Sequence, residues 1–467
     1  MKATFKNIGP IKQAEFELGD LTIIAGQNNT GKTYLVYTLY GFLAMLKQRE
    51  YYFLEFMDHQ KPSKEKKELI KINFSQIKEN GNSKIDFNEY KTIRDEGMKA
   101  VSKNFSSGLL NQVFSTPNGE FGKASFSLDL KCINEKTENQ VLLGPRGKKV
   151  SIKTFFEDHH LIFELDNPEN IQVPDDIIMR GISLSYWGRI QKDCPESFIL
   201  SAERFGISLF YKELDFTKNR LVEELQKLSD KKHFDPFIFI EKESARYAKP
   251  IKDNIDFTRD LAAIQRKKSD LPLNKSRSVE QIMDGYYKAS NEEIRFISKR
   301  RGEKRFDIPL YLASSSARGV SDLYFYLKHV AKKGQILIID EPESHLSPTN
   351  QILMARLLAF CVNSGLKVLI TTHSDYLIKE INNLIMLSSD FEGKNKFLNK
   401  HKKDYLESDY LKPDSVKAYI CEDGGLEQCK VNETGIDMPV FDDAIDNINK
   451  ISNELGCLIT PRDPQDD

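Results

Sequence analysis

One octapeptide constrains the fold more than any other feature: residues 26–33 read GQNNTGKT. The segment fits G-x-x-x-x-G-K-[ST] at every position, follows apolar residues 21–25 and precedes an almost continuously apolar stretch at 33–46. A strand, a glycine-flanked loop and a helix in this order form a phosphate cradle, because glycines let backbone N–H groups close around phosphates. The sequence therefore predicts an α/β fold with a nucleotide at the edge of its sheet.

The octapeptide matches the Walker A motif, so each position has an expected role. Lys32 is expected to reach the terminal phosphates, and the Thr33 hydroxyl to coordinate Mg²⁺. The amino terminus of the following helix adds positive potential. ATP and Mg²⁺ are thus the predicted cofactors, and the other loop residues expected to bind ATP are Gly26, Asn28, Asn29, Thr30 and Gly31.

A second motif places two carboxylates at the end of an apolar strand. Residues 336–339 read ILII and are followed by Asp340 and Glu341. Adjacent carboxylates at a strand end are costly unless a cation neutralises them. We expect Asp340 to hold Mg²⁺, directly or through water, and Glu341 to orient and deprotonate the attacking water.

A third apolar strand, residues 367–372, ends at His373. A histidine there can donate a hydrogen bond to the terminal phosphate or to the attacking water. The predicted catalytic residues are therefore Lys32, Glu341 and His373. For His345, just beyond the second motif, a subunit contact and an ordinary loop position remain equally open.

Apolar periodicity predicts the elements around these motifs. Helices are expected at residues 320–330, 351–360 and 441–454. A heptad pattern at 207–228 predicts a further helix about 33 Å long at ~1.5 Å per residue. The predicted strands are 2–5, 14–18, 21–25, 124–130, 150–155, 161–165, 182–186, 336–339 and 367–372, with a hairpin at 416–422 and 426–431.

Composition narrows the class of protein. The 68 basic and 69 acidic residues nearly cancel, so any nucleic-acid surface must be a local patch. No apolar run approaches the roughly 20 residues of a membrane span, and the amino terminus lacks a secretion signal, which predicts a cytoplasmic protein without membrane contact. The cysteines show no CxxC spacing and are expected to be reduced structural thiols: Cys132, Cys194, Cys361, Cys421, Cys429 and Cys457.

The order GQNNTGKT, a serine-rich helix start, LIIDEPESHLSP and VLITTHSDYL resembles the ABC-type ATPases of the RecF, SMC and OLD class. The resemblance covers residues 1–46 and about 310–390, and reaches the middle only through FILSAER at 198–204. It implies an ABC-type head with a mixed or parallel sheet flanked by helices. The expected division is a head from 1–46 and 306–467 joined by 182–204, a partly β insertion at 47–181, and a helical lid or short arm at 205–305.

The resemblance also assigns residues outside the three motifs. The signature loop, which binds the phosphate held by the other subunit, corresponds to residues 313–317 with Ser314, Ser315 and Ser316, opening a helix near Gly319. Ser316 stands where the family usually has glycine, and a serine run is also an ordinary helix cap. The D-loop corresponds to residues 344–348. Gln191 is either the Q-loop glutamine or a surface residue, and Arg204 either contacts nucleotide or braces the site.

An ABC-type head has an incomplete site, so the resemblance implies a homodimer or higher homo-oligomer that hydrolyses ATP as a switch. The leading expectation is the ATPase component of a bacterial anti-phage defence system, with a separate nuclease or toxin as effector. The alternative is a RecF-like repair ATPase that binds DNA through basic runs at 266–268 and 299–305. A transporter subunit is disfavoured by the roughly 300 residues between Lys32 and Asp340, and a nuclease on this chain by the short segment after His373.

Overall fold

The computed structural model of the 467-residue chain describes ten ranges of residues. These are 1–47, 64–116, 119–130, 138–143, 150–167, 173–211, 247–272, 277–299, 306–438 and 447–456.

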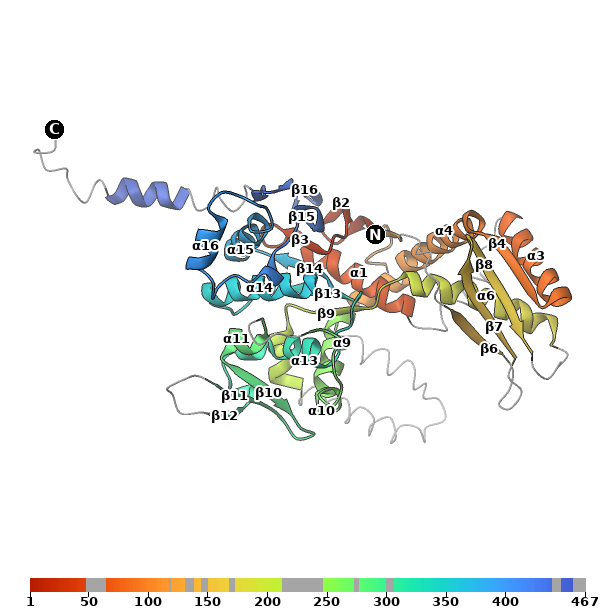
Figure 1. The fold of residues 1–467 in the computed structure, drawn as a ribbon, viewed down its shortest axis with the longest axis horizontal. Coiled ribbons are helices and arrows are strands. Elements are labelled where there is room, and N and C mark those ends of the chain that lie inside the picture. The colour runs from red at the N-terminus through yellow and green to blue at the C-terminus, as the bar shows by residue number, and fades with distance from the viewer. Residues whose placement is uncertain are drawn as a thin grey trace, which may run out of the picture.

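A six-stranded sheet forms the centre of the molecule, in the order β16-β15-β3-β14-β13-β9 (Figure 1). Five strands are parallel, and only the edge strand β16 is antiparallel to its neighbour. The strands at 21–25, 336–339 and 367–372 and the carboxyl-terminal hairpin are confirmed. The strand bounds are β3 (Leu21–Ala25), β9 (Ser197–Leu200), β13 (Ile336–Asp340), β14 (Lys367–Thr372), β15 (Val416–Glu422) and β16 (Gly425–Gln428).

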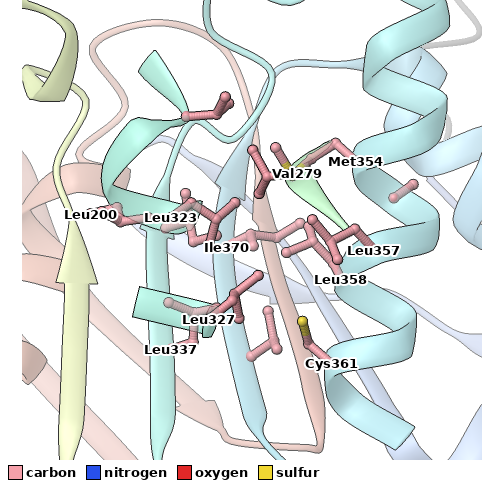
Figure 2. Packing of buried hydrophobic residues seen from close by; sticks show 14 of the residues in the cluster. Leu200, Val279, Leu323, Leu327, Leu337, Met354, Leu357, Leu358, Cys361 and Ile370 are labelled. Atoms are coloured by element: carbon pink, nitrogen blue, oxygen red, sulfur yellow. The ribbon is translucent and has the colours of Figure 1, made fainter. Parts of the chain in front are cut away.

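Both faces of this sheet are buried, which explains why its strands read as continuous apolar runs. On one face, Leu337 and Ile370 pack with Leu357 and other residues of the helices above them, as Figure 2 shows. On the other face, Ile338 packs against the helix that carries Val36. The covering helices are α1 (Lys32–Lys47) on the second face, and α13 (Ser321–His329), α14 (Pro348–Asn363) and α15 (Asp375–Met386) on the first.

A three-stranded antiparallel sheet, β2-β1-β5, packs into the same core as α1. Its strands are β1 (Lys2–Ile8), β2 (Ile11–Glu17) and β5 (Ser125–Asp129). Phe5, Phe16 and Phe126 are all fully buried between this sheet and α1. Although β5 falls within the predicted insertion 47–181, it completes a sheet begun by the first residues of the chain.

A separate lobe extends from one end of the molecule (Figure 1). Its antiparallel sheet has the order β4-β8-β7-β6 and a hydrophobic core of its own around Ile152 and Phe163. The lobe contains α3 (Lys64–Asn80), β4 (Asn82–Asp86), α4 (Phe87–Asn104), β6 (Asn139–Leu143), β7 (Val150–Glu157), β8 (His160–Asp166) and α6 (Asp175–Asp193). The short helices after α4, η1 (Phe105–Leu109) and α5 (Leu110–Phe114), lead back from the lobe and pack in the same core as α1.

The strand predicted at 182–186 is wrong, because these residues lie inside α6. Ile182, Tyr186 and Ile190 follow the four-residue spacing of a helix face, and all three are buried. The helix joins two cores: Ile182 and Tyr186 pack in the lobe, whereas Trp187 and Ile190 pack against the main sheet region. Burial on several faces removes the amphipathic pattern that would have revealed the helix.

Short helices and a small sheet lie below the main sheet in Figure 1. The predicted arm at 205–305 is therefore not purely helical, since it contains β10 and β11. Of the heptad helix predicted at 207–228, residues 207–211 are helical, and 212–228 lie outside the described residues. The elements here are α9 (Lys249–Arg259), α10 (Leu261–Ile264), α11 (Val279–Met283), β10 (Gly285–Ala289), β11 (Ile294–Ser298), β12 (Asp307–Pro309), η2 (Leu310–Leu312) and α12 (Ser315–Gly319).

The carboxyl-terminal part adds α16 (Lys394–Lys400), η3 (Glu407–Asp409), η4 (Pro413–Ser415), β17 (Val431–Asn432) and β18 (Gly435–Ile436). Residues 447–456 form the described part of the predicted last helix, and every residue in it is exposed. Among the helices in the described ranges, none is long and apolar enough to cross a bilayer. The four cysteines within these ranges, Cys194, Cys361, Cys421 and Cys429, are buried and free.

Candidate nucleotide site

The loop between β3 and α1 has the backbone of a phosphate cradle. Gly26 has φ +146° and Gly31 has φ +104°, both in the region that favours glycine. A Cβ on Gly26 would lie 2.4 Å from the carbonyl oxygen of Cys421, and one on Gly31 would lie 2.7 Å from Ile11 Cδ1. The two glycines therefore let the loop lie flat against its neighbours at the start of α1. Asn28 and Asn29 are exposed at the tip.

Lys32 folds back over this loop. Its Nζ donates to the carbonyl oxygen of Gly26 at 3.0 Å and to that of Gln27 at 2.7 Å. Thr30 and Cys421 tighten the same loop, since Thr30 Oγ1 donates to the Gln27 carbonyl and Cys421 Sγ to the Thr30 carbonyl. Burial lowers the pKa of Lys32, while nearby carboxylates act in the opposite direction. The ammonium group is thus held inside the cradle where a phosphate would bind.

Asp340 lies at the end of β13 and is bonded from two sides. Thr33 Oγ1 donates to its Oδ2 at 3.0 Å, and Thr371 Oγ1 donates to its Oδ1. Burial raises the pKa of Asp340 to about 6, although these two hydrogen bonds act to lower it. Burial makes the negative charge of this carboxylate costly, and a cation bound beside it would offset that cost.

Glu341 and His373 form the next contact in the site. His373 Nε2 lies 3.2 Å from Glu341 Oε1, and Ser344 Oγ donates to Glu341 Oε2 at 3.0 Å. The hydrogen bond from His373 is the largest cause that lowers the pKa of Glu341 to about 2. Glu341 also has φ +52°, an uncommon value for a residue with a side chain, and its N–H donates to Thr371. These hydrogen bonds to Thr371, near the end of β14, hold Glu341 in its strained backbone conformation.

Glu343 is a site residue that the sequence interpretation left without a role. Its Oε1 accepts hydrogen bonds from Thr372 Oγ1 at 2.9 Å and from the His373 N–H at 2.6 Å. Burial raises the pKa of Glu343. Glu343 therefore fixes the backbone of His373, whose ring faces Glu341. The acidic sequence DEPE contained the residue, but no local signal showed that this carboxylate bonds the following strand.

Arg204 braces the site, which is one of the two roles that the sequence left open for it. The guanidinium is buried and donates to the carbonyl oxygens of Asp340 at 2.7 Å and Glu341 at 2.6 Å. Its neighbour Glu203 is exposed and accepts from Tyr37 Oη at 2.8 Å. Glu203 is also one of the charges that raise the pKa of Asp340, so its carboxylate lies near the same site.

The serines of the predicted signature loop begin a helix, although four residues earlier than expected. Ser314 caps α12, which starts at Ser315, and its Oγ accepts from the Ala317 N–H. Ser316 Oγ donates to the carbonyl oxygen of His345. Within the described ranges, no hydrogen bond or ion pair joins 314–316 to the 26–33 loop. The helix-cap interpretation is thus realised for Ser314.

Gln191 lies away from the nucleotide loop. Its Nε2 donates to the carbonyl oxygen of Leu46 at 2.6 Å, near the last turn of α1. Lys32 begins the same helix, whose 16 residues make it about 24 Å long. Gln191 is therefore at the wrong end of α1 to contact nucleotide.

The residues fit a magnesium–nucleotide complex better than a metal held by protein alone. The described residues contain no group of three His, Cys, Asp or Glu that could hold a metal ion. Thr33 and Asp340 instead offer two neighbouring oxygen atoms beside the cradle. Mg²⁺ usually takes one or two protein ligands and completes its shell with water and phosphate oxygens.

Comparison with known proteins agrees with this geometry. The model of a family described as "AAA ATPase domain" matches residues 1–378, and the chain belongs to this family. It is accordingly a P-loop ATPase, as the resemblance to the RecF, SMC and OLD class predicted. A search of curated proteins finds no match.

Several solved structures are similar to this chain at low sequence identity. The SMC head domain from Thermotoga maritima is 11% identical, with 92% of this chain and 98% of that chain covered and a TM-score of 0.30. The Smc head domain bound to the C-terminal domain of ScpA from Pyrococcus furiosus is 12% identical, with 97% and 98% covered and a TM-score of 0.29. The recombination mediator protein RecF of the RecFOR pathway is 12% identical, with 91% and 97% covered and a TM-score of 0.28. These likenesses add nothing about function to the family match.

Proposed function

We propose that this chain hydrolyses ATP with Mg²⁺ in a site completed by a second copy, and that it acts as a nucleotide-dependent switch. One observation carries the proposal: Thr33 is bonded to Asp340, and Glu341 to His373, around the cradle that holds Lys32. These residues come from the ends of three parallel strands. Such a cluster suits phosphoryl transfer, in which the protein acts through positioning and electrostatic stabilisation.

Each side chain has a distinct task in the proposed reaction. Thr33 and Asp340 would hold Mg²⁺, which neutralises charge on the phosphates when bound. Lys32 would move from the loop carbonyls to the terminal phosphates. Glu341, ionised because its pKa is about 2, would accept a hydrogen bond from the attacking water. His373 Nε2 would keep that carboxylate oriented.

A second copy is proposed because residues 314–316, here called the serine loop, form no hydrogen bond to the nucleotide loop at 26–33 among the described residues of their own chain. Ser316 is bonded to the turn after β13, and Ser314 to its own helix. In a twofold dimer, each copy would offer this loop to the phosphate of its partner. Loss of the phosphate on hydrolysis would then weaken the interface.

The lobe is proposed to sense or transmit the nucleotide state. Its last helix, α6, packs in both cores and is followed directly by β9, the edge strand beside β13. Residues 201–204 then lead into the nucleotide site. A change in the lobe therefore has a short covalent route to the catalytic carboxylates.

For the biological role, we propose the ATPase component of a bacterial anti-phage defence system with a separate nuclease or toxin. The support is the sequence resemblance in ILSAER, SSSARGVSDL and THSDYL. A DNA-repair role has one observation in its favour: Arg266, Lys267 and Lys268 are exposed together. DNA binding that weakens steeply with salt, without an effector that co-purifies with the chain, would favour repair.

The Glu341→Gln variant tests the shared site. Without its base the variant should bind ATP and Mg²⁺ but fail to release phosphate, so that its mass in solution doubles with ATP and returns to the monomer value with ADP. Glu433→Gln, at an exposed glutamate in a turn, is the matched control and should resemble the unchanged protein. A Glu341→Gln protein that stays monomeric at saturating ATP contradicts the shared site.

A further inference from the structure

Arg204 connects three segments that are far apart in the sequence. Its Nη1 donates to the carbonyl oxygen of Asp340 and its Nη2 to that of Glu341, at the end of the catalytic strand. Its Nε donates to the carbonyl oxygen of Gly319 at 3.0 Å, at the end of α12. A further bond from Nη1 reaches Ser201 at 3.0 Å. One guanidinium thus holds the serine-loop helix and the catalytic strand together.

The next residue makes a second connection between the same two regions. The ring of Phe205 lies 4.6 Å from the guanidinium carbon of Arg318 in α12. The centroid of the same ring lies 4.6 Å from that of His345, in the turn after the catalytic strand. Ser316 of the serine loop bonds the His345 carbonyl directly. The loop and the turn are therefore joined through Phe205 as well as through Arg204.

An arginine suits this position for geometric reasons. The planar guanidinium presents five N–H donors at fixed angles, so it can serve carbonyls from several directions at once. Arg204 is only 4% exposed, and all its bonds given above go to backbone carbonyls. It therefore holds the backbone of Asp340 and Glu341 without engaging their carboxylates. A lysine would keep the charge but could not reach the four carbonyls together.

We propose that Arg204 is a positioning residue that couples the catalytic carboxylate of its chain to the serine loop of the same chain. This inference rests on the proposed dimer, in which the two groups serve different ATP molecules. Glu341 acts on the nucleotide of its own chain, whereas residues 314–316 face the nucleotide of the partner. Arg204 then links the two ATP sites, because a shift of α12 on phosphate contact moves the Glu341 backbone.

The Arg204→Lys variant tests this coupling by three measurements. The first is the turnover number for ATP, which should fall at least tenfold because Glu341 loses the bond from Arg204 to its carbonyl oxygen. The second is the dimer dissociation constant with ATP in the Glu341→Gln background, which should rise at least tenfold because the helix that carries the serine loop loses its bond from Arg204. The third is the affinity of the monomer for a fluorescent ATP analogue, which should change less than threefold, since Lys32 and its loop make no bond to Arg204.

Arg356→Lys is the matched control. Arg356 is also a buried arginine of the same sheet region, but its Nε bonds Glu380 on α15 and its guanidinium lies over the ring of Tyr405. This control should lower the melting temperature without changing turnover or dimerisation. The control separates the effect of losing any buried guanidinium group from the effect of losing the particular bonds that Arg204 makes.

The outcomes divide clearly. Loss of turnover and of dimerisation, with monomer nucleotide affinity retained, supports the coupling. Unchanged dimerisation overturns it and leaves Arg204 as a brace of its own site only. Parallel losses of nucleotide affinity and melting temperature, as large as the other two, overturn it in favour of a general structural role. If the Arg204-containing Glu341→Gln protein fails to dimerise with ATP, the proposed shared site fails first.

Discussion

The hydroxyl of Thr33 donates a 3.0 Å hydrogen bond to the carboxylate of Asp340, although 307 residues separate them in the chain. Thr33 lies at the start of α1, which follows β3, whereas Asp340 ends β13, and β14 lies between these two strands in the sheet. Two proposed magnesium ligands are thus brought together by the sheet before any ion binds. Preassembly of this kind reduces the cost of forming a metal site.

The first prediction concerns this pair. Thr33→Val keeps the shape of the side chain but removes the oxygen, so the Mg²⁺ concentration for half-maximal turnover should rise by about 10–100-fold. Thr33→Ser restores the oxygen and should lie within a few-fold of the unchanged protein. A magnesium titration of phosphate release gives the answer. If the Mg²⁺ titrations of Thr33→Val and the unchanged protein are identical, Thr33 is not a Mg²⁺ ligand.

The second prediction concerns the lysine in the cradle. Lys32→Ala removes a charge proposed to stabilise the transferred phosphoryl group, and turnover should fall on the order of 100-fold or more. Lys367→Ala changes a partly exposed lysine at the opposite end of the same sheet, where it pairs with Asp20, and should keep full turnover. Initial rates at saturating ATP distinguish the two. Retained activity in Lys32→Ala would contradict the assignment of the loop.

The motif-bearing core could be predicted from sequence because each of its signals is local. The run at 21–25 with its glycine loop, and the runs ending at Asp340 and His373, are apolar strands followed at once by polar residues. Parallel strands place their carboxyl ends at one edge, so three local patterns suffice to assemble the site. Among the described residues, the charges of Asp340, Glu341 and Glu343 all act on the pKa of Lys32, which agrees with one common pocket.

The supporting bonds could not be predicted, since their partners lie far along the chain. Arg204 bonds Gly319 and Asp340, which are 115 and 136 residues away. Nothing near 204 indicates those carbonyls, because backbone oxygens carry no sequence signal. The same holds for α6, whose burial in two cores hides its helical period.

The third prediction tests the packing of α1 on α5. Gly41 lies where a Cβ would be only 2.5 Å from Cγ2 of Val113, so Gly41→Ala should destabilise the protein by about 1–3 kcal/mol through overpacking. Gly108→Ala is the control, because a Cβ there meets nothing within 4 Å. Urea unfolding measures the free energy of unfolding of both variants, which are compared at the same slope of this free energy against urea concentration. Since α1 also carries Lys32, a stable Gly41→Ala protein would show that the contact between the two helices is looser than described.

The last prediction is a pH dependence of stability that arises from Asp322. This carboxyl is 2% exposed, accepts a 3.0 Å hydrogen bond from Thr258 Oγ1, and has its pKa raised by burial from 3.8 to about 7. The folded state therefore holds this proton more tightly than the unfolded chain. Between pH 3.8 and 7 the unfolded chain gives up the proton first, so this group makes folding less favourable as the pH rises.

Asp322→Asn cannot ionise and keeps an oxygen for Thr258, so it should lose this part of the pH dependence. Three pKa units correspond to about 4 kcal/mol, and we expect a difference on the order of 2–4 kcal/mol between the two proteins to develop from pH 5 to pH 8. Denaturant unfolding at each pH measures it, with the exposed Asp390→Asn as the control. If the unfolding free energies of Asp322→Asn and the unchanged protein run parallel over this range, Asp322 is not protonated in the fold, and its burial beside Arg204 must be balanced by that cation instead.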